Sequence, residues 1–262
     1  MKYLYEMHLH TGESSRCGVT PAREYIPYYM DLGYDGITVT DHFYGNPSYV
    51  PDRNDPWEKQ IDEYCRGWEE AADEGAKRGF KVFFGIEQQF ANDECLIYGP
   101  DKQWLLAHPD MPFWTRRQLL DEVEKAGGCI VLAHPFRVRD YVVKISLNTC
   151  VHAVEAYNCA NHPQDDIYGL AFAKHYGYPV TAGTDMHLIG GPKELYAMTF
   201  DEPLGCVGDY ARAIRERKTF GVKVAEDRGH GAFAPLERPY EYLDGYGNPV
   251  PWDVSILTGR NA

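Results

Sequence analysis

The sequence predicts an α/β protein whose strands form a parallel sheet, either open or closed into a barrel. Short apolar runs alternate with longer amphipathic segments along most of the 262 residues, and this order builds strand–helix–strand units. Side chains of metal-ligand type follow several of the runs, as expected where the ends of parallel strands form an active site. Hydrophobic residues make up 44% of the chain, which is enough for a sizeable core.

The first half of the chain begins with a predicted strand at residues 3–7. A helix is expected at 21–32, because proline opens it and glycine follows it. Residues 36–40 are short and β-branched, as in a strand. Residues 56–77 are charged with spaced apolar positions and predict a long helix, and 81–86 form the next predicted strand.

The second half continues the alternation. A helix at 115–126 is closed by two glycines, a terminator typical of helices. The remaining elements are predicted from the same two patterns. They are strands at 95–98, 129–133, 153–156, 179–182 and 195–200, and helices at 164–175 and 207–217.

The chain is expected to contain one large domain and a tail. Residues 1–220 carry the alternating pattern, whereas 221–262 are rich in Gly, Pro and Tyr. We predict that this C-terminal extension packs on the domain surface. Its tyrosines Tyr240, Tyr242 and Tyr246 are candidates for contact with a second subunit in a homo-oligomer.

Charge and cysteine content exclude several classes of protein. The net charge of -13 does not favour general binding to nucleic acid. Seven scattered cysteines without a CxxC pair predict a reducing compartment and no disulfide framework. The sequence shows no signal-peptide pattern and no stretch near about 20 apolar residues, so we expect a cytoplasmic protein without a membrane span.

Five predicted strands end in residues that commonly bind metals. In a parallel barrel these ends lie on one face, so side chains that are distant in sequence converge. The candidates are His8 and His10, His42, Glu87, His134, and Asp185 with His187.

The residue types indicate a transition metal. Imidazole and carboxylate together suit zinc, manganese or iron. His8 with His10, and Asp185 with His187, are two residues apart and therefore point to one side of an extended chain. Glu87 is the natural carboxylate to bridge two ions, which would clamp a phosphate and activate water.

Five segments in this order resemble the PHP family, named for polymerase and histidinol phosphatase. They are HLHTGESS, GITVTDHF, GIEQ, LAHPFR and AGTDMH, within residues 1–217. The resemblance implies a distorted, TIM-like (β/α)7 barrel that holds two or three divalent metals and usually has phosphoesterase activity.

The resemblance also implies which residues form each metal site. His8, His10, Glu87 and Asp185 look like the first site, Glu87 and His134 like part of a second, and His42 and His187 like part of a third. Two departures stand out. The segment after Glu87 lacks the histidine usual at the second site. Cys95 is a candidate to replace it, but a buried structural role is favoured for this cysteine. At the third site Glu13 is the available carboxylate, with Arg16 nearby.

Five residues are candidates for roles beside the metals. Arg137 is expected at the rim, where a guanidinium fits phosphate oxygens, and Arg16 is a second candidate for that role. His134 or His187 is expected to protonate the leaving group. Asp41 is expected to orient an imidazole rather than bind metal.

The predicted function is hydrolysis of a phosphomonoester or small phosphodiester by metal-activated water, with a small phosphorylated substrate as the partner. One alternative keeps the metals and changes the bond to an amide or lactone. Another is a non-catalytic barrel that binds a metal or a partner. Substrate choice is expected to lie in the loops at 45–55, 138–150 and 158–166.

Overall fold

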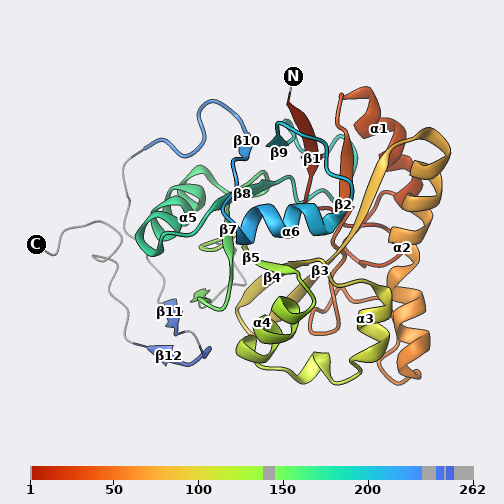
Figure 1. Cartoon of the computed structure of the whole chain (residues 1–262), viewed down its shortest axis with the longest axis horizontal. Helices are drawn as coiled ribbons and strands as arrows, with labels where there is room; N and C mark the ends of the chain where they lie inside the picture. Colours follow the sequence, from red (N-terminus) through yellow and green to blue (C-terminus); the bar gives the residue numbers. More distant parts are fainter. Residues whose placement is uncertain (1, 138–144, 232–239, 245, 251–262) are drawn as a thin grey trace, which may run out of the picture.

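The structure is a computed structural model that describes residues 2–137, 145–231, 240–244 and 246–250. Its centre is a nine-stranded sheet in the order β10-β9-β1-β2-β3-β4-β5-β7-β8, curved into a nearly closed barrel (Figure 1). The strands are β1 (Tyr3–Glu6), β2 (Gly36–Val39), β3 (Lys81–Phe90), β4 (Asp93–Tyr98), β5 (Cys129–Ala133), β7 (Ala153–Asn158), β8 (Val180–Gly183), β9 (Ala197–Phe200) and β10 (Gly221–Lys223).

Most of the helices cover the outside of this sheet, whereas the last one packs against side chains inside the barrel (Figure 1). Glycine in the left-handed conformation ends two of them, at Gly79 and Gly177, both with φ of 70°. The helices are α1 (Tyr25–Asp31), α2 (Trp57–Arg78), α3 (Lys102–Ala107), α4 (Arg116–Lys125), α5 (Pro163–Tyr176) and α6 (Val207–Arg215), with 3₁₀ turns η1 (Ala22–Glu24) and η2 (Met111–Phe113).

The predicted α/β barrel is confirmed, but the sheet is not fully parallel. β4 runs antiparallel to both β3 and β5. The reason is local, because only two residues separate β3 from β4 and a parallel pair needs a crossover of a dozen or more. β9 is antiparallel to β1, and β10 is antiparallel to β9. The prediction of a parallel sheet was therefore wrong at β4 and β9, and β10 was not predicted as a strand.

Backbone contacts nearly close the barrel at the carboxyl ends of β1 and β8. Leu9 and Met186 form an isolated parallel bridge beyond these strands. The N–H of His10 donates to the carbonyl of Met186 at 2.8 Å, and the N–H of Asp185 donates to the carbonyl of His8 at 2.9 Å. The loops that carry candidate ligands are thus tied to each other through their own backbone.

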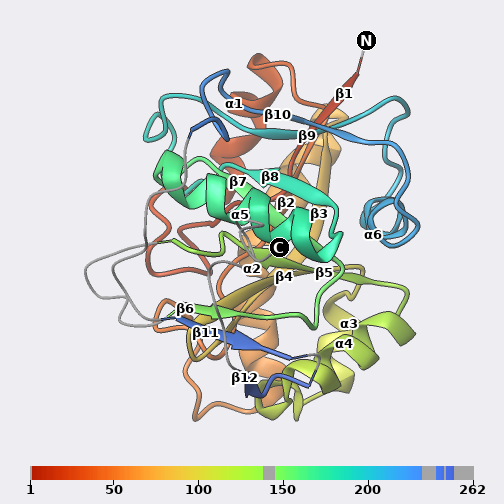
Figure 2. The same ribbon diagram turned by 90° about the vertical axis from the view of Figure 1, so that its left-hand side faces the viewer.

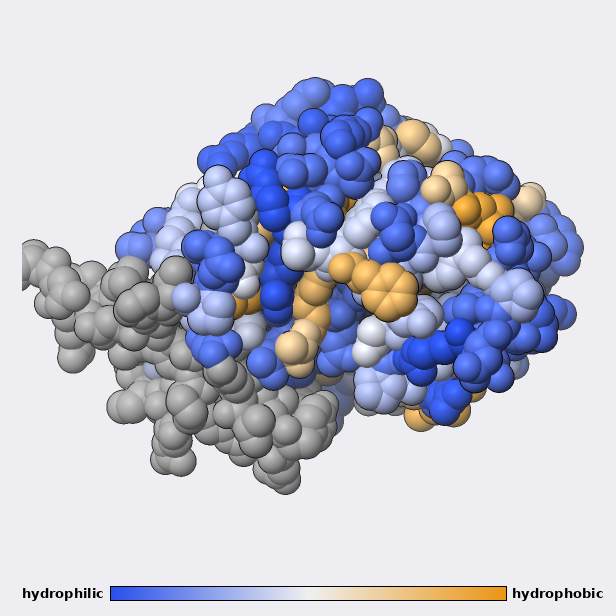
Figure 3. Space-filling model, turned by 90° about the horizontal axis from the view of Figure 1, so that it is seen from below, coloured by the Kyte–Doolittle hydropathy of each residue, from blue (hydrophilic) through white to orange (hydrophobic). Residues whose placement is uncertain are grey.

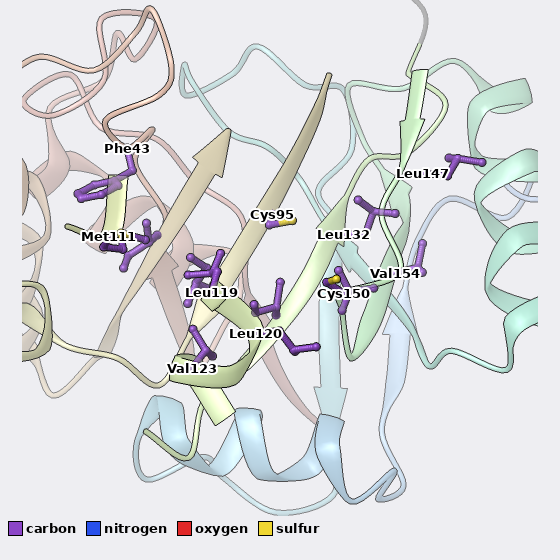
Figure 4. Close-up of a cluster of buried hydrophobic side chains, with 14 of the residues drawn as sticks. Phe43, Cys95, Met111, Leu119, Leu120, Val123, Leu132, Leu147, Cys150 and Val154 are labelled. Atoms are coloured by element: carbon purple, nitrogen blue, oxygen red, sulfur yellow. The ribbon is translucent and has the colours of Figure 1, made fainter. Parts of the chain in front are cut away.

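Alternating residues of the strands fill two different cores. Leu96 and Tyr98 of β4 belong to the cluster inside the barrel, with Tyr210 of α6. Cys95 and Ile97 belong to the cluster between the sheet and the outer helices. Figure 4 shows Cys95 in this outer cluster, near Leu119 and Leu120 of α4. Cys95 thus points away from the barrel interior, as expected of a structural cysteine.

A small second sheet lies apart from the main one (Figure 2). It contains β6 (Ile145–Leu147), β11 (Tyr240–Leu243) and β12 (Pro249–Val250), with β11 between the other two. Two segments of the C-terminal extension therefore pair with strands, β10 with β9 and β11 with β6. Residues 232–239, 245 and 251–262 of the extension, and part of the predicted loop at 138–150, lie outside the described residues.

The described surface is mostly polar. The face in Figure 3 is largely hydrophilic, with hydrophobic side chains gathered in small patches. No helix in the described part of the chain is both long enough and apolar enough to cross a membrane.

Candidate metal centre

The predicted ligands converge at the carboxyl end of the barrel. They come from five strands or from the turns directly after them: His8 and His10 after β1, His42 after β2, Glu87 within β3, His134 after β5, and Asp185 and His187 after β8. β3 is longer than predicted, so Glu87 lies inside a strand and not after it. The side chains form overlapping groups whose ligand atoms lie within 4.8 Å of one another.

The first group contains His8, His10 and Asp185. Nε2 of His8 lies 3.1 Å from Nε2 of His10, and Nε2 of His10 lies 3.1 Å from Oδ1 of Asp185. Both imidazoles are fully buried, and the carboxylate is almost so. Ring nitrogens at this distance can bind one and the same cation.

Glu87 links the first group to two others. Its Oε1 lies 3.2 Å from Nε2 of both His8 and His134, and its Oε2 lies 2.6 Å from Nδ1 of His42. The side chain is fully buried. It belongs to the groups with His8 and His134 and with His42 and Glu94, so it has the position of a bridging carboxylate.

His187 completes a third group with His10 and His42. The ring of His10 is 4.3 Å, centroid to centroid, from each of the other two rings. Nδ1 of His187 lies 2.8 Å from the carbonyl oxygen of Asp185. A carbonyl only accepts, so Nδ1 carries the proton and Nε2 keeps its lone pair for another partner.

Several of these buried atoms have no hydrogen-bond partner among the described residues. Nδ1 of His10 is one of them. Nδ1 of His42 and Oε2 of Glu87 lie 2.6 Å apart, but they do not meet in hydrogen-bonding geometry. A buried polar atom without a partner costs about 1–3 kcal/mol, so such a concentration calls for an external one. Imidazole and carboxylate atoms around common points fit a divalent cation, which accepts electron pairs from all of them.

The electrostatics of the centre depend on this same crowding. Burial raises the pKa of the Glu87 carboxyl, but His42 and His8 outweigh it and hold the pKa well below the usual value. Burial likewise opposes ionisation of Asp185, whereas His8 and Arg137 hold its pKa well below the usual value. Both carboxylates are therefore charged, as metal binding requires.

Glu94 is a candidate ligand that the sequence analysis missed. It lies in the group with His42 and Glu87, and its Oε2 is 3.6 Å from Nε2 of His134. Because β4 is antiparallel, its first residues lie at the same end of the barrel as the last residues of its neighbours. Glu94 shares a face with Leu96 inside the barrel, so its carboxylate lies on the side of the ligand groups.

Glu155 of β7 was also missed, and it orients a ligand. Its Oε1 and Oε2 lie 3.0 and 3.2 Å from Nδ1 of His8, which leaves Nε2 of that ring for the first group. Its Oε2 also accepts from the backbone N–H of His134 at 3.2 Å. A carboxylate behind a ligand imidazole fixes the tautomer and the ring orientation.

Asp41 has a different position from the one predicted. Its Oδ1 accepts from the N–H of Thr11 at 2.7 Å and from Oγ of Ser15 at 2.6 Å, and its Oδ2 accepts from Oγ1 of Thr11 at 2.7 Å. Ser15 Oγ accepts in turn from the N–H of His42 at 3.0 Å. Asp41 therefore orders the loop after β1 and does not hydrogen-bond directly to an imidazole, which is the role that Glu155 has.

Glu13 and Arg16 do not join the ligand groups. Both carboxylate oxygens of Glu13 accept from the N–H of Ala22, at 3.1 and 2.9 Å, where η1 begins. Arg16 is exposed. The neighbouring Cys17 lines the cavity beside His42 and His187 instead. Burial raises the pKa of its thiol, but hydrogen bonding with the two imidazoles outweighs this and lowers the pKa to about 6.

Two candidate ligands have strained backbones. His134 has φ of 29° and Asp185 has φ of 58°, in the region that favours glycine. Such conformations cost on the order of 1–3 kcal/mol and persist where the surrounding structure fixes them, often at functional sites.

The groups lie at the base of a cavity of about 590 Å³. The described lining includes His42, His134, Asp185 and His187. Neutral polar side chains form much of the rest, such as Asn46, Gln89, Asn92 and Ser146. Arg137 is the only Arg or Lys among these lining residues, and its Nη2 lies 2.8 Å from Oδ2 of Asp185.

The remaining histidines lie outside the ligand groups formed by described residues. Nδ1 of His108 lies 2.7 Å from the carbonyl oxygen of Trp104. His152 bonds to Ile130 and Glu124. His162 precedes α5 as its N-cap, and His175 and His230 are exposed.

Comparison with known proteins gives structural neighbours only. No protein-family model and no curated protein matches the sequence. A candidate metal-dependent phosphoesterase from Bifidobacterium adolescentis is 15% identical, with a TM-score of 0.52 over 80% of this chain and 96% of that one. PsfC from Pseudomonas syringae is 15% identical, with a TM-score of 0.56 over 87% and 93%.

A third neighbour is a two-domain protein from Bacteroides vulgatus that contains a predicted PHP-like metal-dependent phosphoesterase. It is 13% identical, with a TM-score of 0.58 over 85% of this chain, which spans 65% of that protein's length. At these identities the likeness concerns the fold. It supports the resemblance to the PHP family that the sequence motifs indicate.

Proposed function

We propose that this protein is a metal-dependent hydrolase that cleaves a phosphomonoester or a small phosphodiester. One observation carries the proposal. Buried imidazole and carboxylate side chains, among them His10 and Glu87, form ligand groups at the base of a cavity that also contains Arg137, and some of their polar atoms have no hydrogen-bond partner among the described residues. The names of the structural neighbours agree with such a reaction.

The ligand groups suggest how two or three ions would be held. His8, His10 and Asp185 would hold one, with Glu87 shared. A second ion would lie near Glu87, His134 and Glu94, and a third near His42 and His187. This assignment replaces Glu13 with Glu94 as the carboxylate added to the seven ligands predicted from the sequence. Divalent ions bound there would supply positive charge to the phosphoryl oxygens and lower the pKa of a water molecule.

Arg137 and His187 are placed to bind the phosphate group and to protonate the leaving group. The guanidinium of Arg137 lines the cavity next to Asp185, where it would hold phosphoryl oxygens and offset the negative charge that develops on them. The side chain of His187 is 31% exposed and lines the same cavity. Where no third ion is bound, the protonated ring of His187 is the better candidate to donate a proton from Nε2 to the leaving oxygen, since His134 lies deeper, at 6% exposed.

The cavity favours a small substrate with one phosphate group. Its volume of about 590 Å³ is in the range of small-molecule sites. Amide side chains such as Asn46 and Asn92 suit hydroxyl or carbonyl groups of the leaving portion. Among the described lining residues Arg137 offers one guanidinium, which suits one phosphate group.

The test combines metal content with activity. Purified protein is analysed for metals, and the same sample is assayed on an aryl phosphate with and without added manganese or zinc. Metal-dependent phosphate release, lost together with bound metal in His10→Ala and Asp185→Ala, is the expected result. Full activity in a metal-depleted variant contradicts the mechanism.

A parallel panel of amide and lactone substrates tests the alternative bond. Faster turnover of those substrates than of phosphate esters would reassign the reaction while keeping the metals. Absence of turnover with every metal and substrate would favour the non-catalytic barrel.

A further inference from the structure

The C-terminal extension contacts the candidate site through a continuous set of hydrogen bonds. Arg228, in the segment after β10, contacts Asp166 of α5. Asp166 contacts Asn161, and Asn161 contacts Arg137 at the cavity. The segment after β10 is the blue trace that leaves the main sheet in Figure 1.

The cavity end of this set fixes the guanidinium of Arg137. Its Nε donates to Oδ1 of Asn161 at 2.9 Å, and its Nη2 donates to Oδ1 of Asn158 at 2.6 Å. The same Nη2 lies 2.8 Å from Oδ2 of Asp185. Two amide oxygens and one carboxylate therefore set where this guanidinium points.

Both asparagines are themselves oriented by buried carboxylates. Nδ2 of Asn158 donates to Oε2 of Glu155 at 2.9 Å, and Nδ2 of Asn161 donates to Oδ1 of Asp166 at 3.0 Å. A carboxylate only accepts, so it selects the NH₂ side of each amide and turns the oxygen side toward Arg137. The position of Asp166 thus decides which atom of Asn161 faces the guanidinium.

Arg228 holds both Asp166 and the loop at 158–161. Its Nε donates to Oδ2 of Asp166 at 2.8 Å, and its Nη2 donates to the carbonyls of Asn158 and Asn161 at 2.9 and 3.0 Å. The guanidinium also lies over the ring of Tyr196, 5.7 Å from its centroid. The Arg228 side chain is 11% exposed and that of Asp166 is 0% exposed, so solvent does not replace this pair.

We propose that Arg228 is a positioning residue for Arg137, through which the C-terminal extension sets the affinity of the site for phosphate. The inference rests on the proposed function for its readout in activity, because Arg137 is the group that would hold phosphoryl oxygens. Without Arg228, Asp166 loses its cationic partner and the loop at 158–161 loses two backbone contacts. Asn161 then no longer presents a fixed oxygen to Arg137.

The central variants are Arg228→Ala and Arg228→Lys, with Arg212→Ala as the matched control. Arg212 also pairs with an aspartate, but it is exposed on α6. We expect Arg228→Ala to raise KM for an aryl phosphate and the inhibition constant of inorganic phosphate by roughly 3- to 30-fold, the usual range for a residue that acts through others. Metal content and kcat should change little, and Arg228→Lys should be intermediate because lysine lacks the planar fork.

A second measurement reports on Arg137 directly and does not need activity. The Nε–H of Arg137 is hydrogen-bonded to Asn161, so it should give a protected side-chain NMR signal, assigned by its loss in Arg137→Lys. This signal should broaden in Arg228→Ala and persist in Arg212→Ala. If Arg228→Ala does not fold, Asn161→Ala tests the cavity end with the Arg228–Asp166 pair intact, and the same rise in KM is expected.

The outcomes separate the two proposals. An unchanged Arg137 signal and unchanged phosphate inhibition in Arg228→Ala would overturn the inference and leave the proposed function standing. A loss of metal with an unchanged Arg137 signal would also overturn it, because the effect would not pass through the guanidinium. If the native protein releases no phosphate, the proposed function fails, and an Arg137 signal unaffected by Arg228→Ala then rejects the coupling as well.

Discussion

Two sets of histidines in this molecule differ in how their ring nitrogens are satisfied. Outside the barrel, Nδ1 of His152 accepts from the N–H of Ile130 at 3.0 Å, and its Nε2 lies 3.1 Å from Glu124. At the barrel end, Nδ1 of His10 is buried without a hydrogen-bond partner among the described residues. In one region the histidine ring nitrogens have protein hydrogen-bond partners, and in the other a ring nitrogen lacks one.

The difference comes from what surrounds each ring. His152 precedes β7 and faces one carboxylate of α4, which supplies a single complementary partner. His10 faces other imidazoles, and His42 and His187 together with burial hold its pKa well below the usual value. The barrel end keeps a buried ring nitrogen without a partner among the described residues, so we expect bound cations to stabilise it, whereas both ring nitrogens of His152 already have protein partners.

The largest effect is expected from removing a shared ligand. His10 belongs to two ligand groups, so His10→Ala should abolish metal binding at both and lower activity more than about 100-fold, beyond the 10–100-fold typical of an outer partner. Added zinc or manganese should raise Tm in the native protein and not in this variant. Differential scanning calorimetry with and without metal measures this, with His152→Ala as the control, and an equal metal response in His10→Ala would break the comparison.

The next effect distinguishes two neighbours in β4. Glu94→Gln should reduce the number of ions bound per chain, because Glu94 faces His42 and Glu87. Cys95→Ala should leave the metal count unchanged and lower the free energy of unfolding, because Cys95 packs in the outer core. Elemental analysis and urea unfolding of both variants test this pair. Metal loss in the cysteine variant would show that the face assignment is wrong.

A smaller effect is expected from the residue behind a ligand. Glu155→Gln should weaken metal binding by about 10- to 100-fold, because His8 loses the carboxylate that fixes its tautomer. Titration calorimetry measures the affinity directly. Unchanged affinity would mean that the imidazole of His8 is held by packing alone.

The smallest effect is expected at the outer pair. Burial lowers the pKa of His152, although Glu124 opposes the shift. The unfolded chain therefore binds a proton on this residue before the folded chain does, so the free energy of unfolding rises with pH up to about 6.5. His152→Gln should flatten this slope and change stability by no more than about 1 kcal/mol. Urea unfolding between pH 5 and pH 8 tests it, and loss of metal in this variant would contradict the separation of the two sets.

The periodicity of the sequence predicted much of the barrel. Residues 36–40 and 129–133 are short, apolar and β-branched, and they became β2 and β5 within one residue at each end. The strand at 81–86 was predicted too short, because its polar end Glu87, Gln88 and Gln89 continues as a strand through pairing with β4. Polar residues inside a barrel mouth do not follow the apolar pattern on which a strand prediction depends.

The sequence by itself determined the ligand chemistry. Histidines two residues apart at 8 and 10, an isolated Glu87 and the Asp185–His187 pair follow predicted strands, and the alternation of elements brings strand ends to one face. Those inferences needed only residue type, spacing and the geometry of α/β units. They depend on properties of short segments, which can be read from the sequence.

Only the tertiary structure decided which residues complete the site. Glu94 reaches it because a two-residue turn makes β4 antiparallel, and Asp41 bonds to Thr11 and Ser15 whereas Glu155 bonds to His8. Arg228 comes within 2.8 Å of Asp166 although 61 residues separate them in sequence. Such contacts depend on the direction of a strand and on how distant segments pack, and no local pattern in the chain encodes either.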